Sequence, residues 1–443
     1  MTDWSHWASL ALLHPERPAL LVVAEGGVGT LPKFPFEEPF FSDVREGPER
    51  IREAFGVDGV ALRPLWNRVD QDVRRIDSLS LYELTGIPQR EGLAWIEESD
   101  LSSIDLPQGI PAGRWRDLLG QSLREDADPG LISVHRPPWS RRGWAPRMRA
   151  WVGGALEVLD RPPLGPLEQV RVWGVSTLWR CRTEVGVAYF KAVPPLFGAE
   201  GAITSTLERL FPGRVPTVLA FDAGRGWLLL DEFRGRSIPK RDPVWLEVMR
   251  SYAAMQIECA PLASRLLATG FADRRLEVFR VQIARLFRES GTVLTWEERG
   301  RLTKLEARIL SSLDELYGFG LPETLVHGDL HFGNVVETVD GPLLFDWTDA
   351  AVAHPFLDLF TLLDFDLDSG LVGAVRPSYL EPWQTSWDAH DLDRAFDIAM
   401  DLSLVYSAIS YQLIVEAQEP ADRWQLGGFV EWALRELLRR TGL

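Results

Sequence analysis

The stretch "LVHGDLHFGNVV", residues 325–336, places an imidazole, a glycine and a carboxylate side by side. The imidazole is His327 and the acid is Asp329, and an amide, Asn334, follows five residues after the acid. Twelve residues beyond the amide, "LLFDWTD" puts Asp346 at the end of an apolar run. Two carboxylates and an amide on such short spacings are typical of a metal site with a base beside it.

Phosphoryl transfer from ATP needs this set of groups. The protein must hold Mg²⁺ against the phosphates, orient an acceptor hydroxyl and accept its proton. Mg²⁺ prefers hard oxygen ligands, which Asn334 and Asp346 would supply. Asp329 would face the hydroxyl as base, while His327 would brace the loop. The spacing therefore predicts a metal site with a base beside it, which suits ATP and Mg²⁺ as cofactors and a small molecule with a hydroxyl group as acceptor.

The segment from residue 168 onward has the pattern of a small antiparallel sheet. "EQVRVW", "LWRCRT" and "AYFKAV" have the pattern of three short strands with tight links. A helix, "AEGAITSTLERLF", and two strands within "VPTVLAFDAGRGWLLLDEF" follow, and the chain beyond residue 240 is mostly helical. We expect a five-stranded sheet with one helix after the third strand, followed by a helical lobe.

A lysine on the third strand of such a sheet would meet the α- and β-phosphates. "YFKAV" offers Lys191 there, and a glutamate on the next helix would orient it. Glu200 opens that helix, and Glu208 lies two turns later on a similar face. The sequence leaves both glutamates open as the partner of the lysine.

"HGDLHFGN" followed by "LFDW" resembles the aminoglycoside phosphotransferase and choline-kinase-like family, which shares the protein-kinase fold. The resemblance covers about residues 168–443. It implies that Asp329 is the catalytic base, that Asn334 and Asp346 hold Mg²⁺, and that Lys191 contacts the phosphates.

The same resemblance assigns the remaining nucleotide contacts. The backbone of the lobe-joining "LLLDEF" would bind adenine, through Asp231, Glu232 and Phe233. The turn "WGVSTLW" departs from GxGxxG, and its hydroxyls, Ser176 and Thr177, would bond phosphates instead. Asp358 matches a family aspartate that braces the catalytic loop, and an ordinary helix N-cap is the alternative.

The expected fold class is α+β, a bilobal protein-kinase-like fold behind an N-terminal α/β domain. Residues 1–104 faintly resemble a Nudix-type domain, but the metal-binding REUxEE helix is incomplete in "REGPERIREAFGVDG". We therefore expect a cap over the acceptor or an interaction domain. Residues 105–167, rich in Pro, Trp and Arg, are interpreted as an extended connector. The small lobe would span 168–235 and the helical catalytic lobe 236–443.

Composition limits the partners. The net charge of -17 on 443 residues argues against nucleic acid and is compatible with cationic small molecules. No apolar run approaches the ~18 residues of a membrane span, and the acidic N-terminus does not resemble a signal peptide. The two cysteines, Cys181 and Cys259, match no metal spacing. We expect a cytoplasmic protein with no membrane partner.

The sequence favours an ATP- and Mg²⁺-dependent kinase of an aminoglycoside-like compound, a sugar or an amino alcohol. One alternative is a nucleotide-binding pseudokinase that acts as an interaction module through its N-terminal domain. A second is an N-terminal hydrolase of nucleoside diphosphate derivatives. Spacing arguments do not identify the acceptor, because acceptors in this fold differ through side chains of the helical lobe.

Overall fold

The computed structural model describes residues 4–25, 28–38, 40–105, 112–289 and 294–442. Contacts divide the chain into two compact units. The first comprises Met1–Pro194 together with Gln418–Gln425, and the second comprises Pro195–Ala417 together with Leu426–Leu443.

The first unit begins with an eight-stranded mixed sheet in the order β5-β6-β1-β2-β3-β8, in which β4 pairs with β1 and β7 with β2. The strands are β1 (Ser5–Leu13), β2 (Leu20–Glu25), β3 (Val28–Thr30), β4 (Lys33–Phe36), β5 (Gly59–Asp70), β6 (Arg75–Leu84), β7 (Leu93–Ile96) and β8 (Ile104–Asp105). Strand β1 runs parallel to β6 and antiparallel to β2 and β4. Helix α1 (Glu46–Phe55) precedes β5 and buries Ile51 and Phe55.

The expectation of an extended connector over 105–167 is wrong in its conformation. This segment contains two helices, α2 (Ala112–Ala127) and α3 (Trp144–Val158). Trp115, Leu119 and Leu123 of α2 recur every four residues and join the buried core of the sheet, as one face of a helix does. The Pro- and Gly-rich stretches that flank each helix masked this periodicity. The predicted domain boundaries themselves stay a prediction.

Three strands follow as an antiparallel meander: β9 (Glu168–Val172), β10 (Thr177–Thr183) and β11 (Gly186–Ala192). The N-terminal sheet is tied to β9 by buried hydrogen bonds. The Gln169 side chain accepts from the Ala61 N–H and donates to the Ala61 carbonyl, both at 2.9 Å. Because both ends of the amide are bonded, this contact fixes the orientation of the Gln169 side chain and joins β9 to Ala61 of β5.

Residues 418–425 return to the first unit from the C-terminal part of the chain. Glu419 accepts hydrogen bonds from Arg136, at 2.8 Å from Nη2, and from Arg63 at 3.2 Å. Arg136 also donates to Glu125 at 2.8 Å, and Arg63 lies 3.4 Å from Asp422. All five side chains are at least nine-tenths buried. Burial alone would raise the pKa of Glu419, but the two arginines outweigh it and lower that pKa.

The second unit begins with helix α4 (Glu200–Leu210) and the antiparallel hairpin of β12 (Val218–Asp222) and β13 (Trp227–Asp231). All five strands expected between 168 and 235 are therefore present, and α4 lies between the third and the fourth in sequence. The α+β class and the predicted order of elements are confirmed.

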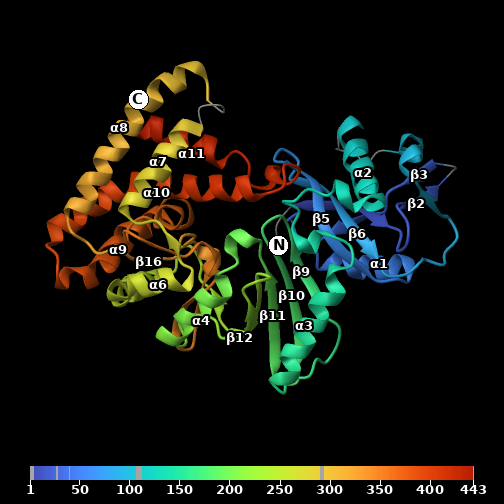
Figure 1. Ribbon diagram of the computed structural model, residues 1–443, viewed down its shortest axis with the longest axis horizontal. Helices are drawn as coiled ribbons and strands as arrows, with labels where there is room; N and C mark the ends of the chain where they lie inside the picture. Colours follow the sequence, from blue (N-terminus) through green and yellow to red (C-terminus); the bar gives the residue numbers. More distant parts are fainter. Residues whose placement is uncertain (1–3, 26–27, 39, 106–111, 290–293, 443) are drawn as a thin grey trace. The chain divides into compact units, whose positions relative to one another are not determined.

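The rest of the second unit is largely helical. Its helices are α5 (Val244–Cys259), α6 (Ala263–Thr269), α7 (Leu276–Glu289), α8 (Trp296–Gly318), α9 (Ser369–Leu380), α10 (Ala389–Ala417) and α11 (Phe429–Arg440). Short strands occur at β14 (Arg236–Ser237), β15 (Ala272–Asp273), β16 (Thr324–Val326), β17 (Val335–Thr338), β18 (Gly341–Leu344) and β19 (Ala351–Ala353). Helices α7, α8, α10 and α11 pack against one another, as Figure 1 shows.

Helix α10 forms the centre of this helical group. Its residues Leu402, Val405, Tyr406 and Ile409 are buried in the core. With a mean hydropathy of 1.5 over 18 residues, α10 is also the one helix, among those the structure describes, long and apolar enough to cross a membrane. The core helix of a globular unit passes the same test, and 56% of that window is buried within the protein.

The buried ion network predicts a large effect for Glu419→Gln. This change leaves Arg63 and Arg136 buried without their shared carboxylate, so the free energy of unfolding should fall by about 3–5 kcal/mol. Urea denaturation monitored by circular dichroism measures it. Glu53→Gln is the control, because the exposed pair of Glu53 and Arg50 should contribute about 1 kcal/mol or less. Equal, small losses in both variants would contradict the prediction.

Candidate active site

The catalytic loop predicted from the sequence begins where β16 ends. His327 is fully buried, and its Nε2 donates to the Phe345 carbonyl at 3.0 Å. Its ring packs against Trp347 with 4.4 Å between the ring centroids. Burial lowers the pKa of His327, although Asp329 opposes this, so the ring is neutral and one nitrogen accepts. These contacts suit the bracing role that the sequence predicts for His327.

Gly328 is the point at which two loops approach most closely. Its φ is +84°, and a Cβ at this position would lie 2.1 Å from the Asp349 carbonyl oxygen. Only glycine combines this left-handed backbone with such a close approach. The pair of loops that carries Asp329 and Asp349 therefore depends on the missing side chain.

Asp329 lies in the loop after Gly328 with its side chain 38% exposed. The Asn334 amide donates to the Asp329 carbonyl at 3.0 Å and to its carboxylate at 3.3 Å. His331, to which the sequence analysis gave no role, lies with its Nε2 3.5 Å from the same carboxylate. Because the Asn334 hydrogens are used by Asp329, the amide oxygen stays free to act as a ligand.

Asp346 follows β18 and adopts the left-handed conformation, with φ 63° and ψ 63°. A non-glycine residue in this region is uncommon and marks a local constraint. The Thr348 hydroxyl donates to the Asp346 carboxylate at 2.8 Å. The preceding residue, Phe345, is the one whose carbonyl binds His327. Contacts on either side of Asp346 in the sequence therefore hold it in place: the Thr348 hydroxyl bonds its carboxylate, and the preceding carbonyl is bonded to His327.

Asp349 was missed by the sequence analysis. Burial first, and the neighbouring Asp329 second, raise the pKa of Asp349, while Arg274 opposes them. The signal was the second acid of "DWTD", three residues after Asp346. The sequence separation between Asp349 and Asp329 does not indicate that they are close, because their two loops meet only in the folded protein.

The oxygen set suits Mg²⁺. In the part of the chain that the structure describes, no three His, Cys, Asp or Glu side chains are arranged to hold a metal. A metal here would depend on Asn334 and Asp346 together with phosphate and water oxygens, which is how Mg²⁺ is commonly bound.

Asp358 braces the catalytic loop from beneath. Its Oδ2 accepts from the backbone N–H of His327 at 2.8 Å and of Gly328 at 3.3 Å, and from the Tyr252 hydroxyl at 2.7 Å. These bonds favour the bracing role over a helix cap. Burial raises the pKa of Asp358 to about 6, although the three donors oppose the shift.

The second unit also contains the residues predicted to bind the lysine and the adenine. Glu200 opens α4 and is 3% exposed, whereas the Glu208 carboxylate accepts from the Val218 N–H at 3.1 Å. At the end of β13, the Asp231 carboxylate accepts from the Glu232 N–H at 3.1 Å. Phe233 packs on Phe345, with 4.9 Å between ring centroids, so the lobe-joining segment reaches the residue before Asp346.

The other three predicted residues belong to the first unit. Lys191 lies on β11, opposite Leu178, and is partly exposed. Ser176 accepts from the Trp173 indole at 2.8 Å. Thr177 is fully buried and donates to the Arg171 carbonyl at 2.9 Å. Their roles toward phosphates stay predictions.

The turn that contains Ser176 is held by the returning segment. The Gly174 N–H donates to the Gln425 side chain at 2.8 Å. A Cβ on Gly174 would lie 2.8 Å from the Gln418 amide nitrogen. The turn is therefore enclosed by residues 418–425, which the sequence analysis did not connect with it.

Comparison with known protein families agrees with this site. Residues 195–393 match the family model described as "Phosphotransferase enzyme family". This segment is a phosphotransferase domain. The match covers less than half of the chain but contains the catalytic loop, Asp346 and Asp358. The prediction of a small-molecule kinase is confirmed for residues 195–393 as far as the class of enzyme. The acceptor is not identified by this match.

No curated protein matches the chain. Among solved structures, a choline/ethanolamine kinase family protein from Mesorhizobium loti is 14% identical, with a TM-score of 0.49 over 66% of this chain and 94% of its own. A macrolide 2'-phosphotransferase from Brachybacterium faecium is 16% identical, with a TM-score of 0.47 over 64% and 98%. A ternary complex of a phosphotransferase with streptomycin and ATP is 15% identical, with a TM-score of 0.45 over 66% and 95%. Likenesses at this level do not identify an acceptor.

Gly328→Ala should disrupt the loop of the phosphotransferase domain. The new Cβ collides with the Asp349 carbonyl in a left-handed backbone, so we expect a loss of at least about 1–3 kcal/mol in the free energy of unfolding. Gly318→Ala, at the end of α8, is the matched control because a Cβ there meets nothing within 4 Å. That variant should be unchanged or slightly more stable. Urea denaturation of both proteins makes the comparison, and an unaffected Gly328→Ala would refute the close approach.

Asp358→Asn should change how stability depends on pH. The folded pKa of about 6 lies above the ordinary value of 3.8, so the stability that Asp358 contributes is present below pH ~4 and lost as the pH rises through ~6. Asn does not titrate. The wild type should therefore lose up to about 3 kcal/mol relative to the variant between pH 4 and 7. Denaturant titrations at several pH values measure the difference, and a constant difference would contradict the assignment.

Proposed function

We propose that this protein is an ATP- and Mg²⁺-dependent phosphotransferase that moves the γ-phosphoryl group of ATP to a hydroxyl of a small molecule. The observation that carries the proposal is the Asn334 amide, which donates to Asp329 and so leaves its oxygen for the metal. One side chain thereby links the base to the metal site.

Asp329 would act as the base. Its carboxylate is partly exposed, as a group that meets an incoming hydroxyl must be, and the Asn334 amide fixes its orientation. The His331 Nε2, 3.5 Å from the same carboxylate, would help to hold it in place. His327, buried and neutral, would hold the loop without exchanging protons with the substrate.

Asn334 and Asp346 would hold the metal, which when bound neutralises charge on the phosphate oxygens. Both supply oxygen, and Asp346 is aimed by its left-handed backbone and by Thr348. Asp349 adds a third carboxyl group close to Asp329. Burial raises the pKa of Asp349, and the charge of a bound cation would favour its ionised form.

The nucleotide contacts are those that the family resemblance implies. Lys191 would contact the α- and β-phosphates. Glu200 is the better candidate for its partner, because the Glu208 carboxylate is occupied by the Val218 N–H. The backbone of Asp231–Phe233 would take the adenine, and Ser176 and Thr177 would contact phosphates from the turn.

The acceptor class remains an aminoglycoside-like compound, a sugar or an amino alcohol. The carboxyl groups of Asp329, Asp346 and Asp349 and the net charge of -17 favour an acceptor with cationic groups. A reducing, cytoplasmic setting suits the two cysteines, which are both free and buried.

The test is ADP release with Mg²⁺ and ATP across aminoglycosides, sugars and amino alcohols. Asp329→Asn should lower turnover on the acceptor by ~10²–10⁴-fold and leave ATP affinity unchanged. Asp346→Ala should weaken ATP binding in the presence of Mg²⁺ but not in its absence.

Wild-type turnover in Asp329→Asn would refute the role of the base. ATP binding by the wild type without turnover on any acceptor would favour the pseudokinase. Absence of ATP binding would contradict both the kinase hypothesis and the pseudokinase hypothesis.

A further inference from the structure

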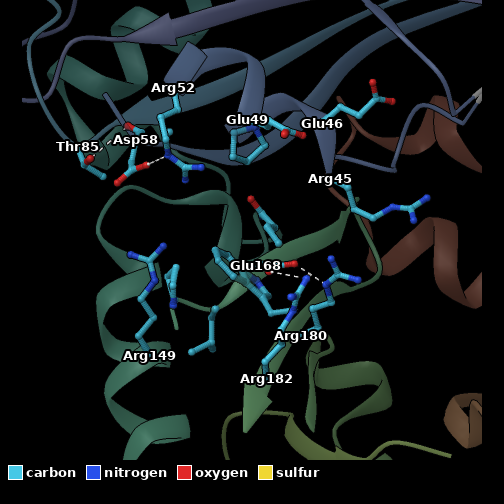
Figure 2. Close-up of a pocket in the computed structure, with 16 residues that line it drawn as sticks. Arg45, Glu46, Glu49, Arg52, Asp58, Thr85, Arg149, Glu168, Arg180 and Arg182 are labelled. Atoms are coloured by element: carbon cyan, nitrogen blue, oxygen red, sulfur yellow. Dashed lines mark hydrogen bonds and ion pairs between the residues drawn. The ribbon is translucent and has the colours of Figure 1, made fainter. Parts of the chain in front are cut away.

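A cavity of about 790 Å³ lies within the first unit, far in sequence from the catalytic loop (Figure 2). Its walls are α1 with the residues before it, Arg149 in the middle of α3, and strands β9 and β10. This volume is typical of sites for small molecules. None of the residues proposed for phosphoryl transfer lines it.

The lining is unusually basic for this chain. Five arginines and four carboxylates face the cavity, whereas the whole chain carries a net charge of -17. The arginines are Arg45, Arg52, Arg149, Arg180 and Arg182. Arginine is the residue that most often binds phosphate groups, because its planar donors match two oxygens at once.

Arg149 marks the first candidate binding position for an anion, which we call the first seat. Its guanidinium lies over the Trp179 ring at 5.4 Å, and no carboxylate of the described residues lies within 4 Å of it in an ion pair. Figure 2 shows Arg52 extending toward Arg149 from the opposite wall. Arg52 pairs with Asp58 at 2.8 Å. The charge of Glu83 also acts on Arg149, so an anion placed between the two guanidinium groups would be bound by their N–H donors rather than by an unbalanced charge.

Arg180 and Arg182 supply a second seat. Both pair with the same carboxylate, Glu168, which Arg180 contacts closely and Arg182 reaches at 3.7 Å. Two cations that share one carboxylate leave one positive charge. Figure 2 shows both side chains reaching the cavity from β10, beside Glu168.

The walls between the two seats are rigid. Trp179, beneath Arg149, is 2% exposed, and Gln169 is bonded at both ends of its amide to Ala61. Arg149 is therefore supported by a fixed ring, so a ligand would lose little free energy in ordering this side chain.

We propose that this cavity binds a small organic molecule with two separate phosphate groups, one between Arg52 and Arg149 and the other at Arg180 and Arg182. The site belongs to the N-terminal unit and is independent of the phosphotransferase activity. It gives the N-terminal region a ligand of its own.

Isothermal titration calorimetry in metal-free buffer tests the site with fructose 1,6-bisphosphate as the probe and fructose 6-phosphate as its single-phosphate counterpart. The wild type should bind the bisphosphate at least tenfold more tightly than the monophosphate. In Arg149→Gln and in Arg182→Gln this preference should be lost. Arg147→Gln is the matched control, because Arg147 is exposed on the same helix and does not line the cavity.

Three results would overturn the proposal: no binding of the bisphosphate to the wild type, the same preference in all variants, or an equal loss in Arg147→Gln. Arg182 is 65% exposed, so its replacement leaves the fold intact and the result interpretable if Arg149→Gln is unstable. Asp329→Asn should bind the bisphosphate as the wild type does, which separates this site from the one proposed for catalysis.

Discussion

One buried carboxylate organises the catalytic loop. Asp358 accepts hydrogen bonds from the backbone N–H groups of His327 and Gly328 and from the Tyr252 hydroxyl. The His327 N–H is also bonded to the Tyr252 hydroxyl oxygen, so the carboxylate and the phenol brace the loop together. The loop then turns at Gly328, where no side chain fits, and presents Asp329 outward. Burying a carboxylate is costly, and its raised pKa expresses that cost. The position of the proposed base therefore depends on a charge that is itself unfavourable to bury.

The sequence predicted the proposed reacting groups because they are close together in it. Asp329 and Asn334 are five residues apart, and the fold joins them by a direct hydrogen bond. Asp349 and His331 were missed for different reasons. Asp349 approaches Asp329 only because the backbone turns at Asp346 and passes Gly328, and His331 looked like a loop residue. Contacts created by a turn in another loop leave no pattern in either stretch alone.

The larger arrangement of the first unit could not be predicted for the same reason. The four-residue spacing of Trp115, Leu119 and Leu123 does indicate a helix, but flanking Pro and Gly residues concealed it. Nothing around Glu419 indicates that it belongs with Arg63 and Arg136, because the pairing depends on tertiary contacts across most of the chain. Local sequence patterns were sufficient to predict the fold class and the order of the elements. They could not predict the ion network, because its residues are far apart in the sequence.

The return of residues 418–425 to the first unit sets an order of events during synthesis. Arg136 and Glu419 are 283 positions apart, so at ~5–20 residues per second the arginines wait on the order of tens of seconds for their acid. Until then the N-terminal sheet can form, but it must leave Arg63 and Arg136 in water. The final packing of the first unit is thus delayed until residues 418–425 have been synthesised, and the N-terminal region reaches its final packing only after most of the second unit has been made.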